Sequence, residues 1–127
     1  MSNGASVEVL QAVVDAFNDH DLDRIMGFFA DGCVLEMPKG PSSFGSQYVG
    51  TQSVRQGLAG RFSGLPDVHY GNPSHFVDGN TGISKWTLTG TTPGGVRIEV
   101  NGCDFYTFRD GKITKKDSYW KIVEARS

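Results

Sequence analysis

"VRIEVNGCDFYTF", residues 96–108, is the stretch that decides the fold of this chain. Apolar and polar residues alternate along it as in a strand, yet Asn101-Gly102 in its middle is the strongest short signal for a hairpin turn. A hairpin would leave two stubby strands, whereas a bulge at Gly102 would give one long, bent strand. Turn signals already lie at both ends, at 93–95 and 109–112, so we favour the long strand with a bulge at Gly102.

Strands fill the second half of the chain. From Asp67 onward the apolar pattern has a period of two and turn signals come at short intervals. The further strands that we expect are "VHYGNPSHFV" (68–77), "GISKWTLTGT" (82–91) and "KITKKDSYWKIV" (112–123).

Helices occupy the first half. Apolar residues recur there at the spacing of one helical face in three groups: Leu10, Val13, Val14 and Phe17; Leu22, Ile25, Met26 and Phe29; Val54, Leu58 and Phe62. Helices followed by strands indicate an α+β fold in which an antiparallel meander curls around the helices.

Local signals set the boundaries in this half. Asp21 is expected to cap the second helix and Asp31-Gly32 to end it. A short strand, "CVLEMP" (33–38), comes next, and Pro38 stops it. The loop 39–50 is rich in Gly, Pro and Ser and suggests a lid or a rim, and Thr51 or Ser53 then caps the third helix.

Length and charge narrow the class of protein. The 127 residues suit one domain, 1–127, and the net charge of -2 without a Lys/Arg cluster disfavours nucleic acid or a membrane surface as partner. A small neutral or weakly charged ligand is more plausible. We expect a cytoplasmic protein, since neither a leader pattern nor a run of about eighteen apolar residues is visible. Cys33 and Cys103 are expected to be reduced and at least half-buried.

Four segments in register resemble the SnoaL-like polyketide cyclases, and more broadly the superfamily of nuclear transport factor two and the ketosteroid isomerases. They are "AFNDHDLDRIMGFFADGCVLEMP" (16–38), "YVGTQSVRQGL" (48–58), "DGNTGISKWTLTGT" (78–91) and "GCDFYTFRDGKI" (102–113). The resemblance implies a single SnoaL-like domain of cystatin-like fold, with three helices in the concavity of a strongly curved mixed sheet. It also implies a deep apolar pocket, a homodimer formed through the outer face of the sheet, and a continuous strand through Asn101-Gly102.

Asp104 is the main catalytic candidate. On a continuous strand, residues 104, 106 and 108 share one face. The ketosteroid isomerases carry an acid on this strand at the same distance before a Phe, and in the cyclases an Asp in this part of the pocket is the proposed acid/base. The resemblance therefore implies a carboxylic acid held neutral by an apolar site, able to donate a hydrogen bond or exchange a proton. The alternative is an Asp solvated beside a bulge or bonded to a backbone amide.

The chain departs from the isomerase pattern at two positions. The oxyanion-holding Tyr of helix one and the base carboxylate of the first strand correspond to Val13 and Met37. Thr92 stands where the cyclases often have His. Steroid isomerisation by the usual triad is therefore not expected.

Other residues could assist Asp104 or simply pack. Tyr106 could donate to a substrate oxygen or pack on Phe108, and Tyr48 on the rim loop could bind a ligand. His69 is a candidate proton partner and His75 a weaker one; their six-residue spacing nominally places them on one face, although Gly71 and Pro73 interrupt it. The expected pocket walls, which core packing would explain equally well, are Val13, Met37, Trp86, Leu88 and Trp120.

Some residues are expected to take no part. Glu36 should point away from the pocket by alternation. Lys115, Lys116 and Asp117 read as a solvated segment. Two His without a third ligand make no metal site, and no cofactor is expected.

Two functions are compatible with these observations. One is a cofactor-independent isomerase, cyclase or lyase acting by proton transfer on a small apolar carbonyl or polyketide-like compound. The other is a dimeric module that binds a hydrophobic ligand or a protein without chemistry.

Overall fold

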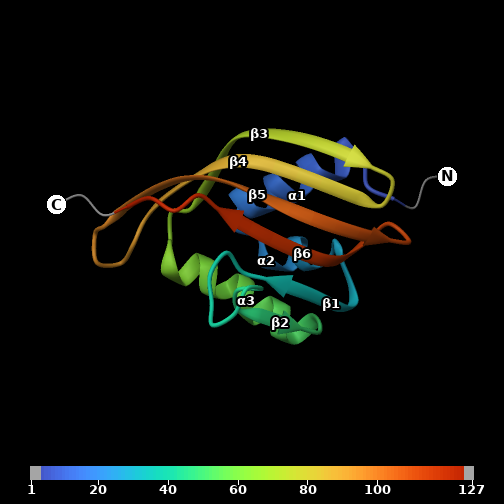
Figure 1. The fold of residues 1–127 in the computed structure, drawn as a ribbon, viewed down its shortest axis with the longest axis horizontal. Helices are drawn as coiled ribbons and strands as arrows, with labels where there is room; N and C mark the ends of the chain where they lie inside the picture. The colour runs from blue at the N-terminus through green and yellow to red at the C-terminus, as the bar shows by residue number, and fades with distance from the viewer. Residues whose placement is uncertain (1–3, 125–127) are drawn as a thin grey trace.

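The computed structural model describes residues 4–124, which form three helices on one side of a curved, unclosed, six-stranded sheet (Figure 1). The strand order is β2-β1-β6-β5-β4-β3, and the sheet is mixed because β1 and β6 run parallel while the other pairs are antiparallel. This architecture confirms the expected α+β class. The elements are α1 (Val7–Asn18), α2 (Leu22–Met26), β1 (Phe29–Glu36), β2 (Gln47–Val49), α3 (Thr51–Gly64), β3 (His69–Asp78), β4 (Thr81–Thr91), β5 (Arg97–Arg109) and β6 (Lys112–Trp120).

The helices cover the concave face of the sheet. The Ser6 hydroxyl caps α1 by accepting from the Val9 amide at 3.1 Å, and the apolar stripe of α1 is buried. Helix α1 packs on β3 and α3 on β1. In Figure 1, α1 lies behind β4 and β5, and α3 lies beside β1 and β2. Of the helices in residues 4–124, none has the length and apolar character needed to cross a membrane.

The second helix is shorter than expected. It ends at Met26, and Phe29 already pairs with Ile113 in the sheet. Asp31-Gly32 was expected to end the helix, but it lies inside β1, where the pairing with β6 shifts between Phe29 and Val34 and Gly32 has φ 71°. Pairing with β6 therefore outweighs the apolar stripe that would have continued the helix.

The expected loop 39–50 is also partly ordered. Its last residues form β2, which pairs antiparallel with β1. The N-cap of α3 is Gly50, at φ 91°, and no side chain caps the helix. The prediction of a Thr51 or Ser53 cap is therefore wrong, because a glycine in an extended positive-φ conformation makes the turn from β2 into the helix.

Strand β5 runs without a break through Asn101-Gly102. Its register with β4 is continuous from the Thr81–Thr107 pair to the Thr91–Arg97 pair. The continuous strand is confirmed, but the bulge expected at Gly102 is not present. Gly102 is required for another reason: a Cβ there would lie 2.8 Å from the Trp86 ring and would meet the Tyr119 carbonyl oxygen.

The bulge lies on the neighbouring strand, β6. Thr107 pairs with Lys115 and Phe108 with Ile113, so Thr114 has no partner on β5. One extra residue reverses which face the following side chains point to. Ile113 and Lys116, three residues apart, are consequently both buried.

A second irregularity separates the two strand histidines. The pairing of β3 with β4 shifts between Gly71 and Ser74, and Asn72 there has φ 52°. His69 and His75 therefore lie on opposite faces, which corrects the expectation that they share one.

Both cysteines are free, with Cys33 buried and Cys103 partly buried, as expected.

Candidate functional site

Asp104 lies on the concave face of β5 and is 3% exposed. Its neighbours across the sheet form one row of polar residues. His75 on β3 pairs with Ser84 on β4, Ser84 with Asp104, and Asp104 with Ser118 on β6. The row crosses the middle of an otherwise apolar face, so it is the one place on the concave side of residues 4–124 where buried polar side chains gather in this way.

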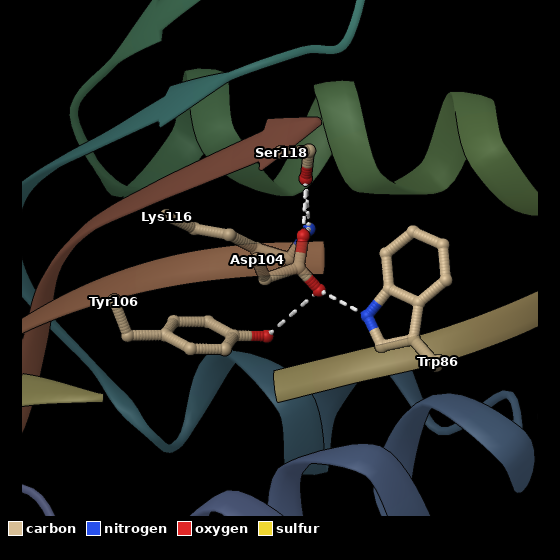
Figure 2. Close-up of polar contacts among 5 residues, drawn as sticks. All are labelled: Trp86, Asp104, Tyr106, Lys116 and Ser118. Carbon is tan, nitrogen blue, oxygen red and sulfur yellow. Dashed lines mark hydrogen bonds and ion pairs between the residues drawn. The ribbon is translucent and has the colours of Figure 1, made fainter. Parts of the chain in front are cut away.

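The Asp104 carboxylate accepts hydrogen bonds from four side chains (Figure 2). Trp86 Nε1 donates to Oδ2 at 3.0 Å, and the Tyr106 hydroxyl reaches the same oxygen at 3.5 Å. Lys116 Nζ donates to Oδ1 at 3.0 Å and the Ser118 hydroxyl at 2.5 Å. Each oxygen thus has two donors, an arrangement that suits an ionised carboxylate, which only accepts.

Lys116 makes Asp104 half of a buried ion pair. Both side chains are 5% exposed, and Lys116 Nζ also contacts the Ser118 hydroxyl at 2.7 Å and lies 5.4 Å from the centre of the Phe17 ring. The Lys116 ammonium is the counter-ion of the carboxylate. The site expected to be apolar around Asp104 therefore also contains a second charged side chain.

Strand alternation alone could not have found Lys116. Counting in twos from Ile113 points residues 115 and 117 inward and leaves Lys116 in solvent, in agreement with the expected solvated segment. The bulge at Thr114 reverses this and buries Lys116 at 4% and Ser118 at 6% exposure. Trp86 was expected as an apolar wall, and it acts in addition as a hydrogen-bond donor to Asp104.

Two buried tyrosines stay protonated beside the ion pair. Burial raises the pKa of Tyr106 well above 10, and the charge of Asp104 raises it further. Burial likewise raises the pKa of Tyr70, against an opposing effect of Arg61. Tyr106 therefore remains a donor at every physiological pH.

The expected pocket walls are divided between core and edge. Val13 and Leu88 are 0% exposed and Trp86 is 3% exposed, so these three pack in the hydrophobic core where the resemblance implied a deep pocket. The remaining candidates are partly buried residues packed against that core: Met37, Tyr48 and Trp120.

His69 does not join Asp104. It is exposed and pairs with Thr89, on the convex side of the sheet. His75, the weaker candidate, lies on the concave side, with Nδ1 2.9 Å from the Ser84 hydroxyl and Nε2 2.8 Å from Gln11 Oε1. The extra residue in β3 is the reason, because it reverses the alternation between the two histidines.

Glu36 points away from Leu35 and the core, as expected, but it is not solvated. It is 2% exposed, and it contacts Lys115 Nζ at 3.1 Å and Gln47 Nε2 at 2.9 Å. Lys115 is 42% exposed, and Asp117, whose pKa is raised mainly by burial, lies beside the pair. This second polar group belongs to the convex side of the sheet.

A cleft of about 370 Å³ opens on that convex side, between residues 36–45 and the strand β6. Lys115, Asp117 and Tyr119 line it, and Phe44 on the loop is 62% exposed. Asp104 and Tyr106 do not line this cleft. Within residues 4–124, no three His, Cys, Asp or Glu side chains gather as a metal ion would require.

A model of the SnoaL-like domain matches residues 10–116. The chain belongs to the SnoaL-like domain family. This match covers α2, α3, most of α1, and Trp86, Asp104, Tyr106 and Lys116 of the buried cluster, while Ser118 lies two residues beyond it. None of the curated proteins compared with the chain matches it.

Solved structures share this SnoaL-like fold at low sequence identity. A candidate polyketide cyclase from Xanthomonas campestris pv. campestris is 20% identical over 90% of this chain and 88% of its own, with a TM-score of 0.79. TerC, co-crystallised with polyporic acid, is 20% identical over 91% and 90%, with a TM-score of 0.77. A protein of ketosteroid isomerase-like fold from Catenulispora acidiphila DSM 44928, in complex with trimethylamine, is 15% identical over 93% and 88%, with a TM-score of 0.79.

Proposed function

We propose that this SnoaL-like protein is a cofactor-independent enzyme that moves a proton at a carbon next to a carbonyl group, as an isomerase, cyclase or related lyase. The observation that carries the proposal is the buried Asp104–Lys116 pair, in which a base and a cationic acid lie 3.0 Å apart inside an apolar core. Buried pairs of ionisable groups are candidate functional sites.

The two charges divide the chemistry between them. Asp104 Oδ2 would take a proton from the α-carbon, and the electrons of that C–H bond would move to the carbonyl oxygen to form an enolate. The Lys116 ammonium and the Tyr106 hydroxyl would donate hydrogen bonds to that oxygen. Return of the proton to another carbon completes an isomerisation. Alternatively, the enolate carbon attacks a second carbonyl to close a ring, and the resulting alkoxide takes the proton back from Asp104.

Lys116 would replace a donor that the chain lacks. The isomerase Tyr on helix one corresponds to Val13, which is apolar and fully buried. A buried cation can hold a developing oxyanion from a different strand, and such a donor is typically worth about a hundred- to a thousand-fold in rate. The missing Tyr therefore does not rule out oxyanion stabilisation.

The substrate would be a small, largely apolar carbonyl or polyketide-like compound. Trp86 donates to Asp104 and the Phe17 ring lies 5.4 Å from Lys116 Nζ, so aromatic side chains border the pair. Val13 and Leu88 belong to the same hydrophobic core, and Met37 and Trp120 pack against that core. Access requires movement of the side chains that cover the pair, since Asp104 and Lys116 are almost fully buried. The binding of polyporic acid by TerC, a neighbour of the same fold, is consistent with this substrate class.

Proton exchange on a simple ketone tests the proposal. We expect the protein to accelerate deuterium incorporation at the α-carbon of 2-tetralone in D₂O, followed by NMR. Asp104→Asn should lower that rate about a hundred- to ten-thousand-fold, whereas Asp110→Asn, in the exposed turn after β5, should not change it. An unchanged rate in Asp104→Asn would exclude the role of Asp104.

The alternative function is a binding module without chemistry. One observation favours it: all four donors around Asp104 belong to the chain itself, so the carboxylate has its hydrogen bonds without a substrate. In that case 2-tetralone would bind, with no exchange above the uncatalysed rate.

We also propose that the protein is a homodimer formed through the convex face of the sheet. Phe76, Phe105 and Tyr119 are 56%, 40% and 54% exposed there, and Phe105 and Tyr119 form an edge-to-face pair at 5.5 Å. Neighbouring exposed aromatic residues of this kind often mark an interface. Sedimentation equilibrium should give a dimer for the natural chain and a monomer for Phe105→Glu; a monomeric natural chain would contradict the proposal.

A further inference from the structure

Arg61 lies at the edge of the aromatic core, in the last turn of α3. Its guanidinium carbon is 4.6 Å from the centre of the Trp120 ring, and the residue is only partly exposed. Trp120 is the last residue of β6, two residues beyond Ser118 on the same face of the strand. Arg61 therefore joins the end of the helix to the end of the strand that carries Lys116.

No carboxylate of residues 4–124 pairs with Arg61. Three other arginines do have acidic partners: Arg24 with Asp19 at 3.1 Å, Arg55 with Asp23 at 2.7 Å, and Arg97 with Asp67 at 3.9 Å. The side chains of these three arginines are 42% to 60% exposed, so their ion pairs lie at the surface. Arg61 thus keeps its charge next to apolar surface without an acidic partner in the described chain.

The surroundings of Arg61 lead to the Asp104 cluster. Burial raises the pKa of Tyr70, the charge of Arg61 opposes that rise, and the charge of Asp104 adds to it. Tyr70 packs edge-to-face on Trp86 at 5.0 Å, and Trp86 donates to Asp104. Asp104 is paired with Lys116, so its carboxylate is already matched by a cation other than Arg61.

We propose that Arg61 binds a carboxylate on the substrate, so that the protein acts on flat, apolar carbonyl compounds that carry an acid group. This inference rests on the proposed function, since it names the substrate class of the same site. A guanidinium placed over an aromatic ring can still present N–H groups at its edge to a carboxylate, with two parallel hydrogen bonds. The partly exposed Trp120 ring would hold the flat part of the molecule. Tyr70 and Trp86, 6% and 3% exposed, belong to the core and would support that ring.

A purely structural role for Arg61 makes a different prediction. A cation in the last turn of a helix stabilises the helix dipole, and its stem can pack on a Trp ring without any ligand. Either effect would change stability, but neither would make binding depend on the charge of a ligand.

Two matched probes separate these roles: 2-naphthoate and the neutral 2-naphthamide, which have the same ring and nearly the same shape. Isothermal titration calorimetry should show tighter binding of naphthoate to the natural chain. Arg61→Gln should weaken naphthoate roughly ten- to a hundred-fold and naphthamide less than about two-fold, with Arg61→Lys in between. Arg109→Gln, at the exposed end of β5, is the control and should change neither.

Three results would overturn the inference: equal affinity of the natural chain for both probes, no binding of either, or an unchanged affinity ratio in Arg61→Gln whose circular dichroism shows a folded chain. The deuterium exchange of 2-tetralone, a neutral ketone, is measured separately on the natural chain. Loss of the affinity ratio without exchange would refute the proposed chemistry alone, and exchange without any dependence of the ratio on Arg61 would refute this inference alone.

Discussion

Lys116 Nζ lies 3.0 Å from Asp104 Oδ1, on an adjacent strand, and only 5% of either side chain is exposed. Isolated charges do not persist in such surroundings, because the loss of hydration is costly unless partners replace water. Here Ser118 bonds to both ions, and Trp86 and Tyr106 reach the second carboxylate oxygen. The two ions therefore depend on each other, and we expect removal of either one alone to lower the free energy of unfolding strongly.

Lys116→Met tests this dependence directly. It should lower the free energy of unfolding by about 3–5 kcal/mol, because it leaves the Asp104 charge buried without its counter-ion. Urea unfolding followed by circular dichroism measures the change. Lys85→Met, an exposed lysine on β4, is the matched control and should stay within about 0.5 kcal/mol of the natural chain. The double variant Asp104→Leu with Lys116→Met should recover part of the loss, and no recovery would contradict the ion-pair explanation.

Deletion of Thr114 tests the bulge that buries Lys116. Ile113 and Lys116 lie three residues apart and both face the core, so the deletion leaves them two apart, and regular alternation keeps Lys116 and Ser118 bonded to Asp104. We expect this variant to keep the deuterium exchange of 2-tetralone. Deletion of Thr114 together with Lys115 places Lys116 next to Ile113 and turns it towards solvent, so that variant should have a lower midpoint of thermal unfolding and no exchange. Equal behaviour of the two deletions would show that strand alternation does not decide which face carries Lys116.

Gly102→Ala tests the close packing of Gly102 against the Trp86 ring. The added methyl group would lie 2.8 Å from the Trp86 ring, on which Asp104 depends for a hydrogen bond. Overpacking of this kind typically costs about 1–3 kcal/mol. Gly94→Ala, where the nearest atom would be 3.9 Å away, is the control for loss of glycine itself. Urea unfolding of both should separate them, and similar stabilities would mean that the Trp86 ring moves aside freely.

The pH dependence of stability should include a contribution from His75. Burial lowers the pKa of His75 in the folded chain, and the charge of Asp15 opposes this in part. As the pH falls, His75 takes up a proton in the unfolded chain near pH 6.5, and in the folded chain only at a lower pH. The free energy of unfolding is therefore highest above pH 6.5 and decreases as the pH falls below that value. The neutral ring also keeps its contacts to Ser84 and Gln11. Between pH 7.5 and 5.5 the natural chain should lose more free energy of unfolding than His75→Gln, and parallel curves would contradict this.

Sequence patterns identified the elements better than their ends. The apolar stripe of α1, the position of α3 and the long strand through Gly102 were all visible in the spacing of residues. The end of α2 was not, because Phe29 fits a helical stripe as well as it fits β1, and pairing with Ile113 decides between them. Asp104 was placed correctly on the concave face, since β5 keeps its register with β4.

The partners of Asp104 were much harder to find. Lys116 and Ser118 follow a bulge, so simple alternation from Ile113 places both on the wrong face. His69 and His75 lie on either side of another bulge, so simple alternation wrongly places them on the same face. Arg61 comes close to Trp120 only because α3 packs along the sheet, which no local pattern reveals.

The amino-acid order alone determined the α+β class and the helix-then-strand arrangement, because these follow from the periodicity of apolar residues along a short stretch. The family resemblance added the expectation that Asp104 faces the core. Only the tertiary structure decided that the acid is paired with Lys116. A single unpaired residue, Thr114, reverses the direction of every side chain after it, and its position depends on how two distant strands align.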